Sequence, residues 1–324
     1  MGIVDLPEIK MARRLFAKHS LTIPFDIDEL ISNYGEIIYK NIPFDGIDGV
    51  SINIKVPGKF PRIIVNDTLP PKRQLFTKAH ELGHIIIPWH LGTIVDDIYS
   101  QDYKDFIYSE LEQEANRFAA ELLMPTDWVN EQILKLKDNY AKLHKTIAER
   151  SGVSDYAVAI RLMGVLPKNI VYTAVENNYV KHSGRTSNTD AYLQENNQVF
   201  NEGYYLYVDS YSQYQANSIT YHWWKISDEV DIATEDKREW REILDEIVND
   251  IKPVEGASQF KKSINAIIAH ANGKVKRESN YSVNSVISAC ISRLRRDGLE
   301  NFTNHGDFDS FIKIKVTDLV NKKK

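Results

Sequence analysis

The chain has 324 residues, of which 43% are hydrophobic and 26% are charged, and it carries a formal net charge of −5. This mix is typical of a folded protein, and at roughly 100–200 residues per domain the length predicts two domains. The net negative charge argues against a protein dominated by phosphate or nucleic-acid binding, and the single cysteine excludes an internal disulfide framework.

The start of the chain has no apolar signal-peptide core, and no apolar run reaches the length of about 18–20 residues that a membrane-spanning helix needs. Together with the lone cysteine, these features predict a protein of the reducing cytoplasm. Cys290 lies at helical spacing from Val286 and Leu294. We therefore interpret it as a buried small hydrophobe and not as a nucleophile.

The beginning of the chain predicts short helices followed by strands. The expected elements are helices at 8–19 and 26–33 and strands at 37–39, 50–54 and 62–65. Pro70 and Pro71 predict the start of a long helix, because proline is tolerated where the amide would have no partner anyway. Pro88 predicts its end, and residues 91–104 are expected to form a loop or a short excursion.

Helices are also predicted at 105–124 and 126–138, with Thr126 as the N-cap of the second. Residues 142–166 resemble a helix-turn-helix, with a turn at Gly152 and Ser154 capping the helix that follows it. After Pro167 the composition becomes rich in tyrosine, asparagine and serine. We therefore expect two domains, 1–167 and 168–324.

The second part of the chain predicts another α+β domain. Its expected elements are strands at 170–174, 204–208 and 219–226, helices at 240–251, 257–271 and 282–296, and an exposed final strand at 311–316. The aromatic runs at 204–207 and 221–224 suit either a binding surface or a sheet core. Sheet core is favoured, because aromatic residues are good strand formers.

A His-Glu-x-x-His motif stands in the helix that begins at the paired prolines, at His80, Glu81 and His84. Residues four apart share one helix face, one turn apart, so the two imidazoles can bind one Zn²⁺ at about 2.0–2.1 Å each. Glu81 points roughly 100° around the helix from His80, which suits a general base acting on water. Gly83 is interpreted as a point where a neighbouring element packs closely.

A catalytic zinc site needs a third protein ligand, and His90 is the nearer of two candidates. It follows His80 by ten residues, a spacing that one group of zinc peptidases uses. That arrangement needs a glycine where Ile87 stands, and Pro88 turns the chain differently. His90 is therefore kept as the alternative third ligand.

The favoured third ligand is Glu112, because it borders the apolar stripe of the helix predicted at 105–124. Asn116 lies one turn later on the same face, and its amide is expected to hydrogen-bond the outer side of a metal ligand. Glu110 and Glu114 are expected to face solvent, where acidic residues near a helix N-terminus favour the helix dipole.

Two blocks of the sequence together resemble the ImmA/IrrE family of metallopeptidases. They are Arg73–His84, RQLFTKAHELGH, and Glu112–Pro125, EQEANRFAAELLMP. The resemblance covers about residues 20–166 and does not reach 168–324. It implies a gluzincin-like α+β core with a small sheet, Zn²⁺ on His80, His84 and Glu112, and Glu81 as the catalytic base.

The resemblance also implies a regulatory endopeptidase that cleaves a separately encoded repressor or antitoxin, in a stress response, a toxin–antitoxin pair or a mobile element. Direct nucleic-acid binding is not expected, since the helix at 154–163 offers only Arg161 as a cation. The rival functions are a non-catalytic zinc protein that binds a partner and a DNA-binding regulator. Retention of Glu81 favours catalysis, because a structural zinc site needs no base. Residues 168–324 are expected to sense a signal, recognise substrate or bind a partner.

Overall fold

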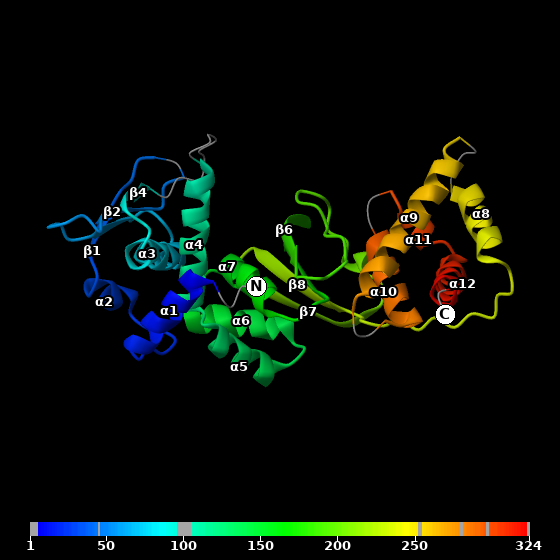
Figure 1. Ribbon diagram of the computed structural model, residues 1–324, viewed down its shortest axis with the longest axis horizontal. Helices are drawn as coiled ribbons and strands as arrows, with labels where there is room; N and C mark the ends of the chain where they lie inside the picture. Colours follow the sequence, from blue (N-terminus) through cyan, green and yellow to red (C-terminus); the bar gives the residue numbers. More distant parts are fainter. Residues whose placement is uncertain are drawn as a thin grey trace. The chain divides into compact units, whose positions relative to one another are not determined.

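The structure is a computed structural model that describes residues 6–44, 46–95, 105–251, 255–278, 281–295 and 298–322 (Figure 1). The chain divides into two compact units, Met1–Val165 and Leu166–Lys324. Each unit combines helices with one four-stranded sheet, so the protein is α+β, as expected. In the part of the chain that is described, no helix is long and apolar enough to cross a membrane.

The first unit is built around a sheet with the strand order β1-β3-β2-β4. Strand β1 runs parallel to β3, and β2 runs antiparallel to β3 and to β4. The elements of this unit are α1 (Pro7–Lys18), α2 (Ile27–Ser32), β1 (Glu36–Lys40), β2 (Gly49–Ile54), β3 (Arg62–Asn66), α3 (Pro71–Ile86), β4 (Gly92–Val95), α4 (Asp105–Leu123), α5 (Thr126–Leu136), α6 (Tyr140–Ser151) and α7 (Asp155–Val165).

Helix α3 is the centre of this unit, because it contacts strands β2 and β3 and also packs along α4 (Figure 1). Pro71 opens it and Ile86 ends it, two residues before Pro88, as the prolines predict. The prediction of a loop at 91–104 is wrong at its start, because Gly92–Val95 pairs with β2 as strand β4. Four residues are too few to show a strand period. Residues 96–104 lie outside the described residues.

The end of the first unit contains α6 and α7 on either side of Gly152, whose φ of +72° suits glycine. The Ser154 hydroxyl accepts a hydrogen bond from the Ala157 amide at 3.3 Å, as predicted. Thr126 is the first residue of α5 and not its N-cap, which is Pro125. The Thr126 hydroxyl donates instead to Glu121 at 2.7 Å.

Arg161 is the cation that the sequence singles out on the helix after this turn. Its side chain is 9% exposed, and its guanidinium binds the Glu121 carboxylate at 2.5 Å and the Met124 carbonyl at 2.8 Å. Arg13 of α1 binds the same carboxylate at 2.7 Å. The charge of Arg161 is therefore used inside the fold, where it ties α7 to the end of α4.

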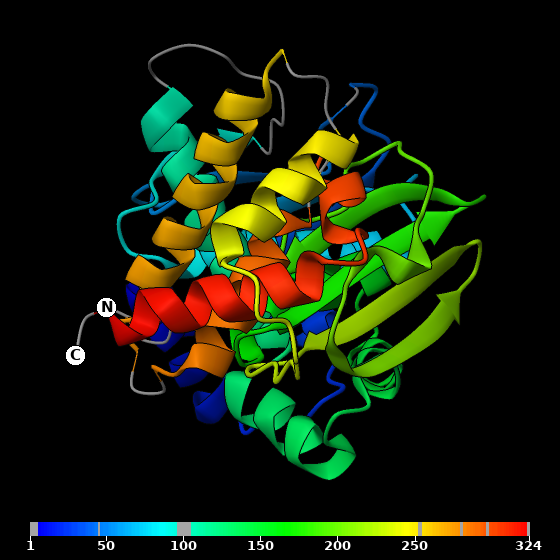
Figure 2. The same ribbon diagram turned by 90° about the vertical axis from the view of Figure 1, so that its right-hand side faces the viewer.

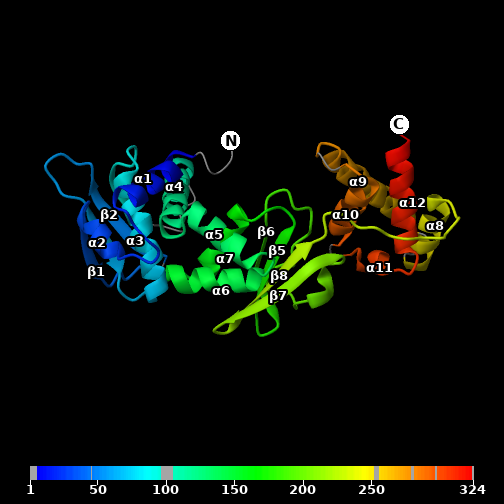
Figure 3. The same ribbon diagram turned by 90° about the horizontal axis from the view of Figure 1, so that it is seen from below.

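The second unit begins with an antiparallel sheet in the order β6-β5-β8-β7, and helices follow it (Figures 2 and 3). The elements of this unit are β5 (Ile170–Glu176), β6 (Tyr179–Arg185), the 3-10 turn η2 (Glu202–Tyr204), β7 (Val208–Ala216), β8 (Ile219–Ile226), α8 (Trp240–Ile251), α9 (Ala257–Val275), α10 (Val283–Leu294), α11 (Glu300–Thr303) and α12 (Phe308–Asn321). Tyr221, Trp223 and Trp224 are buried, which confirms their assignment to a core.

The predicted final strand at 311–316 is wrong, because these residues lie within α12, which packs on α8 and α10 (Figure 2). The run alternates apolar and lysine residues, but only over six positions. Phe308, Phe311, Ile312 and Val316 recur three and four residues apart and are all buried. This wider spacing is the helical signal, and the burial of that face decides the structure.

Candidate metal centre

His80 and His84 lie one turn apart on α3 and both turn their Nε2 atoms the same way. The two Nε2 atoms are 3.0 Å apart. The side chains are 4% and 0% exposed, respectively. The spacing of four residues therefore brings two potential donor nitrogens together in a buried place.

Glu112 of α4 closes the group from the opposite helix. Its Oε2 lies 2.9 Å from His80 Nε2, and its Oε1 lies 3.4 Å from His84 Nε2. In the part of the chain that is described, these three residues are the group that could hold a metal ion, with donor atoms all within 4.8 Å of one another. The arrangement joins the two helices that the sequence singled out.

Gly83 allows α3 and α4 to approach each other at this point. A Cβ atom on Gly83 would lie 3.1 Å from the ring of Phe118 and 3.4 Å from the Cα atom of Ala115, both on α4. The prediction that this glycine permits close packing is confirmed. A side chain here would force the Phe118 ring or the neighbouring backbone of α4 to shift.

The protonation states of these side chains suit a metal ligand set. Burial lowers the pKa of His84 to about 4, so the imidazole is neutral at neutral pH. Burial opposes the charge of Glu112, but the hydrogen bonds from His80 and His84 outweigh it and lower the pKa of this carboxyl to about 2. Neutral imidazoles and an ionised carboxylate are the forms that bind metals.

The outer nitrogen of each imidazole has a polar partner. His80 Nδ1 lies 3.0 Å from Asn116 Oδ1, and Asn116 is the residue predicted for this contact. His84 Nδ1 lies 2.7 Å from His90 Nδ1. His90 therefore sits behind His84, on the side away from Glu112, and not among the three converging side chains.

His90 continues to a second acidic residue on α4. Its Nε2 lies 2.9 Å from Glu114 Oε2, and the Trp89 indole donates to the same oxygen at 2.6 Å. The expectation that Glu114 faces solvent is wrong, because its side chain is only 16% exposed and these contacts hold it. The contact of Glu114 with Trp89 and His90 could not be predicted from sequence spacing. It forms because the turn after α3 brings residues 89–90 close to α4.

Glu81 contacts strand β2, and it is fully buried. The Ser51 hydroxyl donates to Glu81 Oε2 at 2.6 Å. A Cβ atom on Gly49 would lie 2.6 Å from Glu81 Oε1 and 2.7 Å from Thr77 Cγ2, so a side chain at this position would displace one of these groups. Neither Ser51 nor Gly49 was predicted from the sequence. Both reach Glu81 only because β2 packs against this turn of α3, which is a tertiary contact.

Lys55, just after β2, caps the end of α3. Its ammonium donates to the carbonyls of Ile87 at 2.7 Å, His90 at 2.9 Å and His84 at 3.3 Å. A cation at a helix C-terminus is favoured by the helix dipole, and burial lowers the pKa of this lysine to about 8. Lys55 therefore fixes the backbone that carries His84 and His90.

The donor set and its spacing fit a zinc ion. Tetrahedral ligands at about 2.0–2.1 Å from zinc lie roughly 3.3 Å from one another, and the three donor pairs given above measure 3.0, 2.9 and 3.4 Å. Two imidazoles and a carboxylate are a ligand combination found in catalytic zinc sites. The side chains are thus already close to the positions that a bound ion would require.

The fold is thus α+β, and the site has side chains that could hold a metal ion. Residues 36–163 match the family model of the IrrE N-terminal-like domain, Peptidase_M78, and this segment belongs to that family. The match includes α3, α4, and all the residues of the candidate metal centre.

Other comparisons add little. No curated protein matches the chain. A solved structure described as a Mycobacterium tuberculosis transcriptional regulator is similar at 14% identity and a TM-score of 0.37, over 56% of this chain. This chain covers 55% of that one. Such a likeness carries no inference about function.

Proposed function

We propose that the protein is a zinc-dependent endopeptidase in which Glu81 assists the attack of water on a peptide bond. One observation carries the proposal: His80, His84 and Glu112 converge from two helices, while Glu81 stands next to His80. A purely structural zinc site would have no need of that carboxylate. Membership of residues 36–163 in a peptidase family supports the same reading.

Zinc would lower the pKa of water and polarise the peptide carbonyl. Glu81 takes one proton from the attacking water as its oxygen bonds to the carbonyl carbon. The same carboxyl then delivers that proton to the amide nitrogen as the carbon–nitrogen bond breaks. As the new carboxyl group ionises, the second proton of water passes to the amine, so the products are a carboxylate and an ammonium group, and Glu81 returns to its starting state. The Ser51 hydroxyl, 2.6 Å from Glu81, holds the carboxylate in one orientation throughout.

Asn116, His90 and Glu114 orient the imidazoles in this proposal. A histidine that binds metal through Nε2 carries its proton on Nδ1. His80 then donates to Asn116, and His84 donates to His90. His90 in turn donates through Nε2 to Glu114. Such outer hydrogen bonds fix the ring positions and raise the basicity of the ligand.

The finer assignments rest on the family resemblance. We propose a gluzincin-like zinc peptidase domain at 1–167, with its helix-turn-helix-like segment at 142–166, and a sensor, substrate-recognition or partner-binding role for 168–324. The proposed substrate is a separately encoded regulatory protein such as a transcriptional repressor or antitoxin. The proposed setting is the cytoplasm.

The ligand assignment is tested by measuring bound zinc in purified variants. Glu112→Ala should lose the metal, whereas Glu110→Ala, an exposed residue on the same helix, should keep it. Glu112→Ala protein with full zinc content would overturn Glu112 as the third ligand. Activity is tested by incubating the zinc-loaded protein with the product of the adjacent gene and with a proteome-derived peptide library read by mass spectrometry. Bound zinc without any cleavage would favour the non-catalytic, partner-binding alternative.

A further inference from the structure

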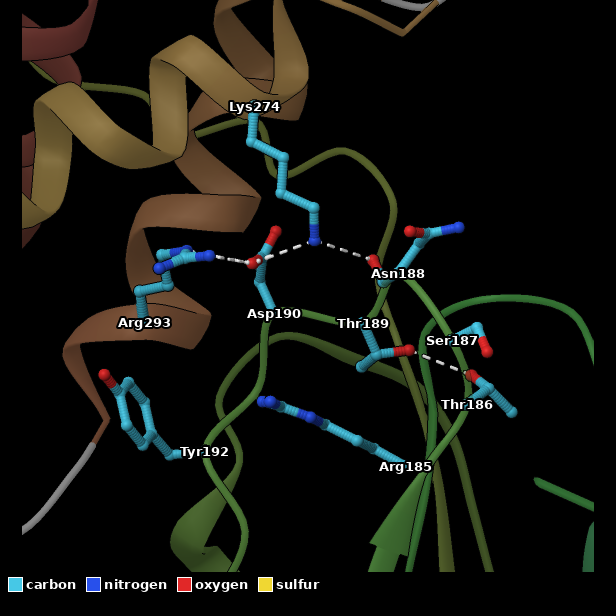
Figure 4. Close-up of a pocket in the computed structure, with 9 residues that line it drawn as sticks. All are labelled: Arg185, Thr186, Ser187, Asn188, Thr189, Asp190, Tyr192, Lys274 and Arg293. Carbon is cyan, nitrogen blue, oxygen red and sulfur yellow. Dashed lines mark hydrogen bonds and ion pairs between the residues drawn. The ribbon is translucent and has the colours of Figure 1, made fainter. Parts of the chain in front are cut away.

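The second unit contains a polar cavity that is separate from the metal centre. It has a volume of about 450 Å³ and lies between the loop that follows β6 and the helices α9 and α10 (Figure 4). This volume is within the range of about 300–1,000 Å³ that is usual for small-molecule sites. Its lining is formed almost wholly by charged and hydroxyl-bearing side chains.

Three cations point into this cavity from three different elements. Arg293 of α10 and Lys274 of α9 reach toward Asp190, and Arg185 extends from the end of β6 beneath them (Figure 4). The Arg185 guanidinium also donates to the Ala191 carbonyl. Among the described residues that line the cavity, Asp190 is the only carboxylate, so their three positive charges and one negative charge leave an excess of two positive charges.

The two helix cations share a single oxygen atom. Asp190 Oδ1 accepts from Arg293 at 2.6 and 2.8 Å and from Lys274 at 3.1 Å. The Asp190 side chain is 9% exposed, whereas those of Arg293 and Lys274 are 23% and 28% exposed. The carboxylate therefore lies beneath the cations. One carboxylate cannot neutralise both charges, although the Lys274 ammonium also donates to the Asn188 carbonyl at 3.3 Å.

The loop that supplies Asp190 is held in place before any ligand arrives. The Thr186 and Thr189 hydroxyls lie 2.9 Å apart and are buried. Thr189 Oγ1 accepts from the Asn169 amide at 2.8 Å, and the Thr186 amide donates to the Ile170 carbonyl at 3.0 Å. Such preorganisation lowers the entropy lost on binding.

We propose that this cavity binds the phosphate group of a small molecule. Guanidinium groups match phosphate oxygens with paired hydrogen bonds, and an ammonium adds a point charge. The excess of two positive charges suits the two negative charges of a phosphate monoester or of free phosphate near neutral pH. A bound phosphate would bridge the strand loop to α9 and α10, and so would stabilise the second unit. This site does not depend on the proposed peptidase activity.

The test is isothermal titration calorimetry on the full chain with inorganic phosphate, adenosine monophosphate and glucose 6-phosphate, at matched ionic strength. Saturable binding of at least one of them is expected. Tighter binding of an ester assigns the site to a phosphorylated metabolite, and equal binding assigns it to free phosphate. No saturable heat with any of the three at millimolar concentration would overturn the proposal.

Variants distinguish phosphate binding in the cavity from non-specific electrostatic attraction of anions to the protein. Lys274→Gln and Arg185→Gln should each weaken binding by about tenfold, the effect expected for losing a hydrogen bond to a charged group. Lys262→Gln removes the same charge from an exposed position of α9 and should leave affinity unchanged. Arg185→Lys retains the charge and should bind better than Arg185→Gln. Equal losses for Lys262→Gln and Lys274→Gln would contradict a defined site, and circular dichroism checks that each variant is folded.

Discussion

The contact behind His84 offers a sharp test of how the metal centre is built. Replacing His90 with leucine removes the partner of His84 Nδ1, 2.7 Å away, and the partner of Glu114, 2.9 Å away. Loss of such an outer hydrogen bond weakens metal affinity by about 10- to 100-fold, which corresponds to roughly 1.4–2.7 kcal/mol. The assay is competition for zinc against a chromophoric chelator at neutral pH.

A loss of overall stability must be separated from this effect. His90→Leu leaves His84 Nδ1 without its partner, at about 1–3 kcal/mol, and removes one of the two donors to Glu114, which keeps the Trp89 indole. His144 is a matched control, because it is also fully buried and its Nε2 lies 3.0 Å from the Asp155 carbonyl, on helices that do not supply the metal ligands. His144→Leu should lower the free energy of unfolding and leave zinc affinity unchanged.

A second substitution refines the test. Asparagine at position 90 can place its carbonyl oxygen near the former Nδ1 atom and so accept from His84, but it cannot reach Glu114. His90→Asn should therefore bind zinc more tightly than His90→Leu. Zinc affinity of His90→Leu equal to that of the unmodified protein would refute the orienting role of His90.

Other predictions concern Glu121, Gly49 and Cys290. Burial opposes the charge of Glu121, but the attraction of Arg161 outweighs burial and lowers the pKa of this carboxyl. The ion pair therefore stabilises the fold at pH values above the ordinary glutamate pKa, and this stabilisation is lost as the pH falls below that value. Glu121→Gln should thus lower the free energy of unfolding by about 3 kcal/mol at neutral pH and by less in acid. Urea unfolding measures this difference between the variant and the unmodified protein, and an equal difference at both pH values would contradict the prediction. In Gly49→Ala the new methyl group would lie 2.6 Å from Glu81 Oε1, so cleavage should fall by about a hundredfold with zinc content unchanged; full cleavage would show that Glu81 tolerates displacement. Burial raises the pKa of the Cys290 thiol, so a thiol reagent should modify it only in denaturant, and rapid modification of the native protein would argue against its burial.

The sequence predicts the parts of the candidate site that depend on helical spacing. His80 and His84 share a face because they are four residues apart, and Glu112 and Asn116 do so for the same reason. The prolines at 71 and 88 correctly bound the helix that carries the motif. Local rules of this kind need no knowledge of the rest of the fold.

Contacts that depend on tertiary packing could not be predicted. Ser51 and Gly49 reach Glu81 only because β2 lies against α3, and Glu114 meets His90 only after the turn at the end of α3. The final helix was missed for a related reason. Six alternating residues favoured a strand, whereas the packing of α12 against α8 and α10 selects the helix.

The central claim is that Glu81 acts chemically beside a zinc ion held by His80, His84 and Glu112. The direct measurement compares the unmodified protein with Glu81→Gln, which keeps the shape of the side chain and an acceptor for Ser51. Zinc content is determined by mass spectrometry, and cleavage is followed on the same peptide library. We expect one zinc per chain in both proteins and cleavage only by the unmodified one. Cleavage that survives in Glu81→Gln, or an unmodified protein that binds no zinc, would contradict it.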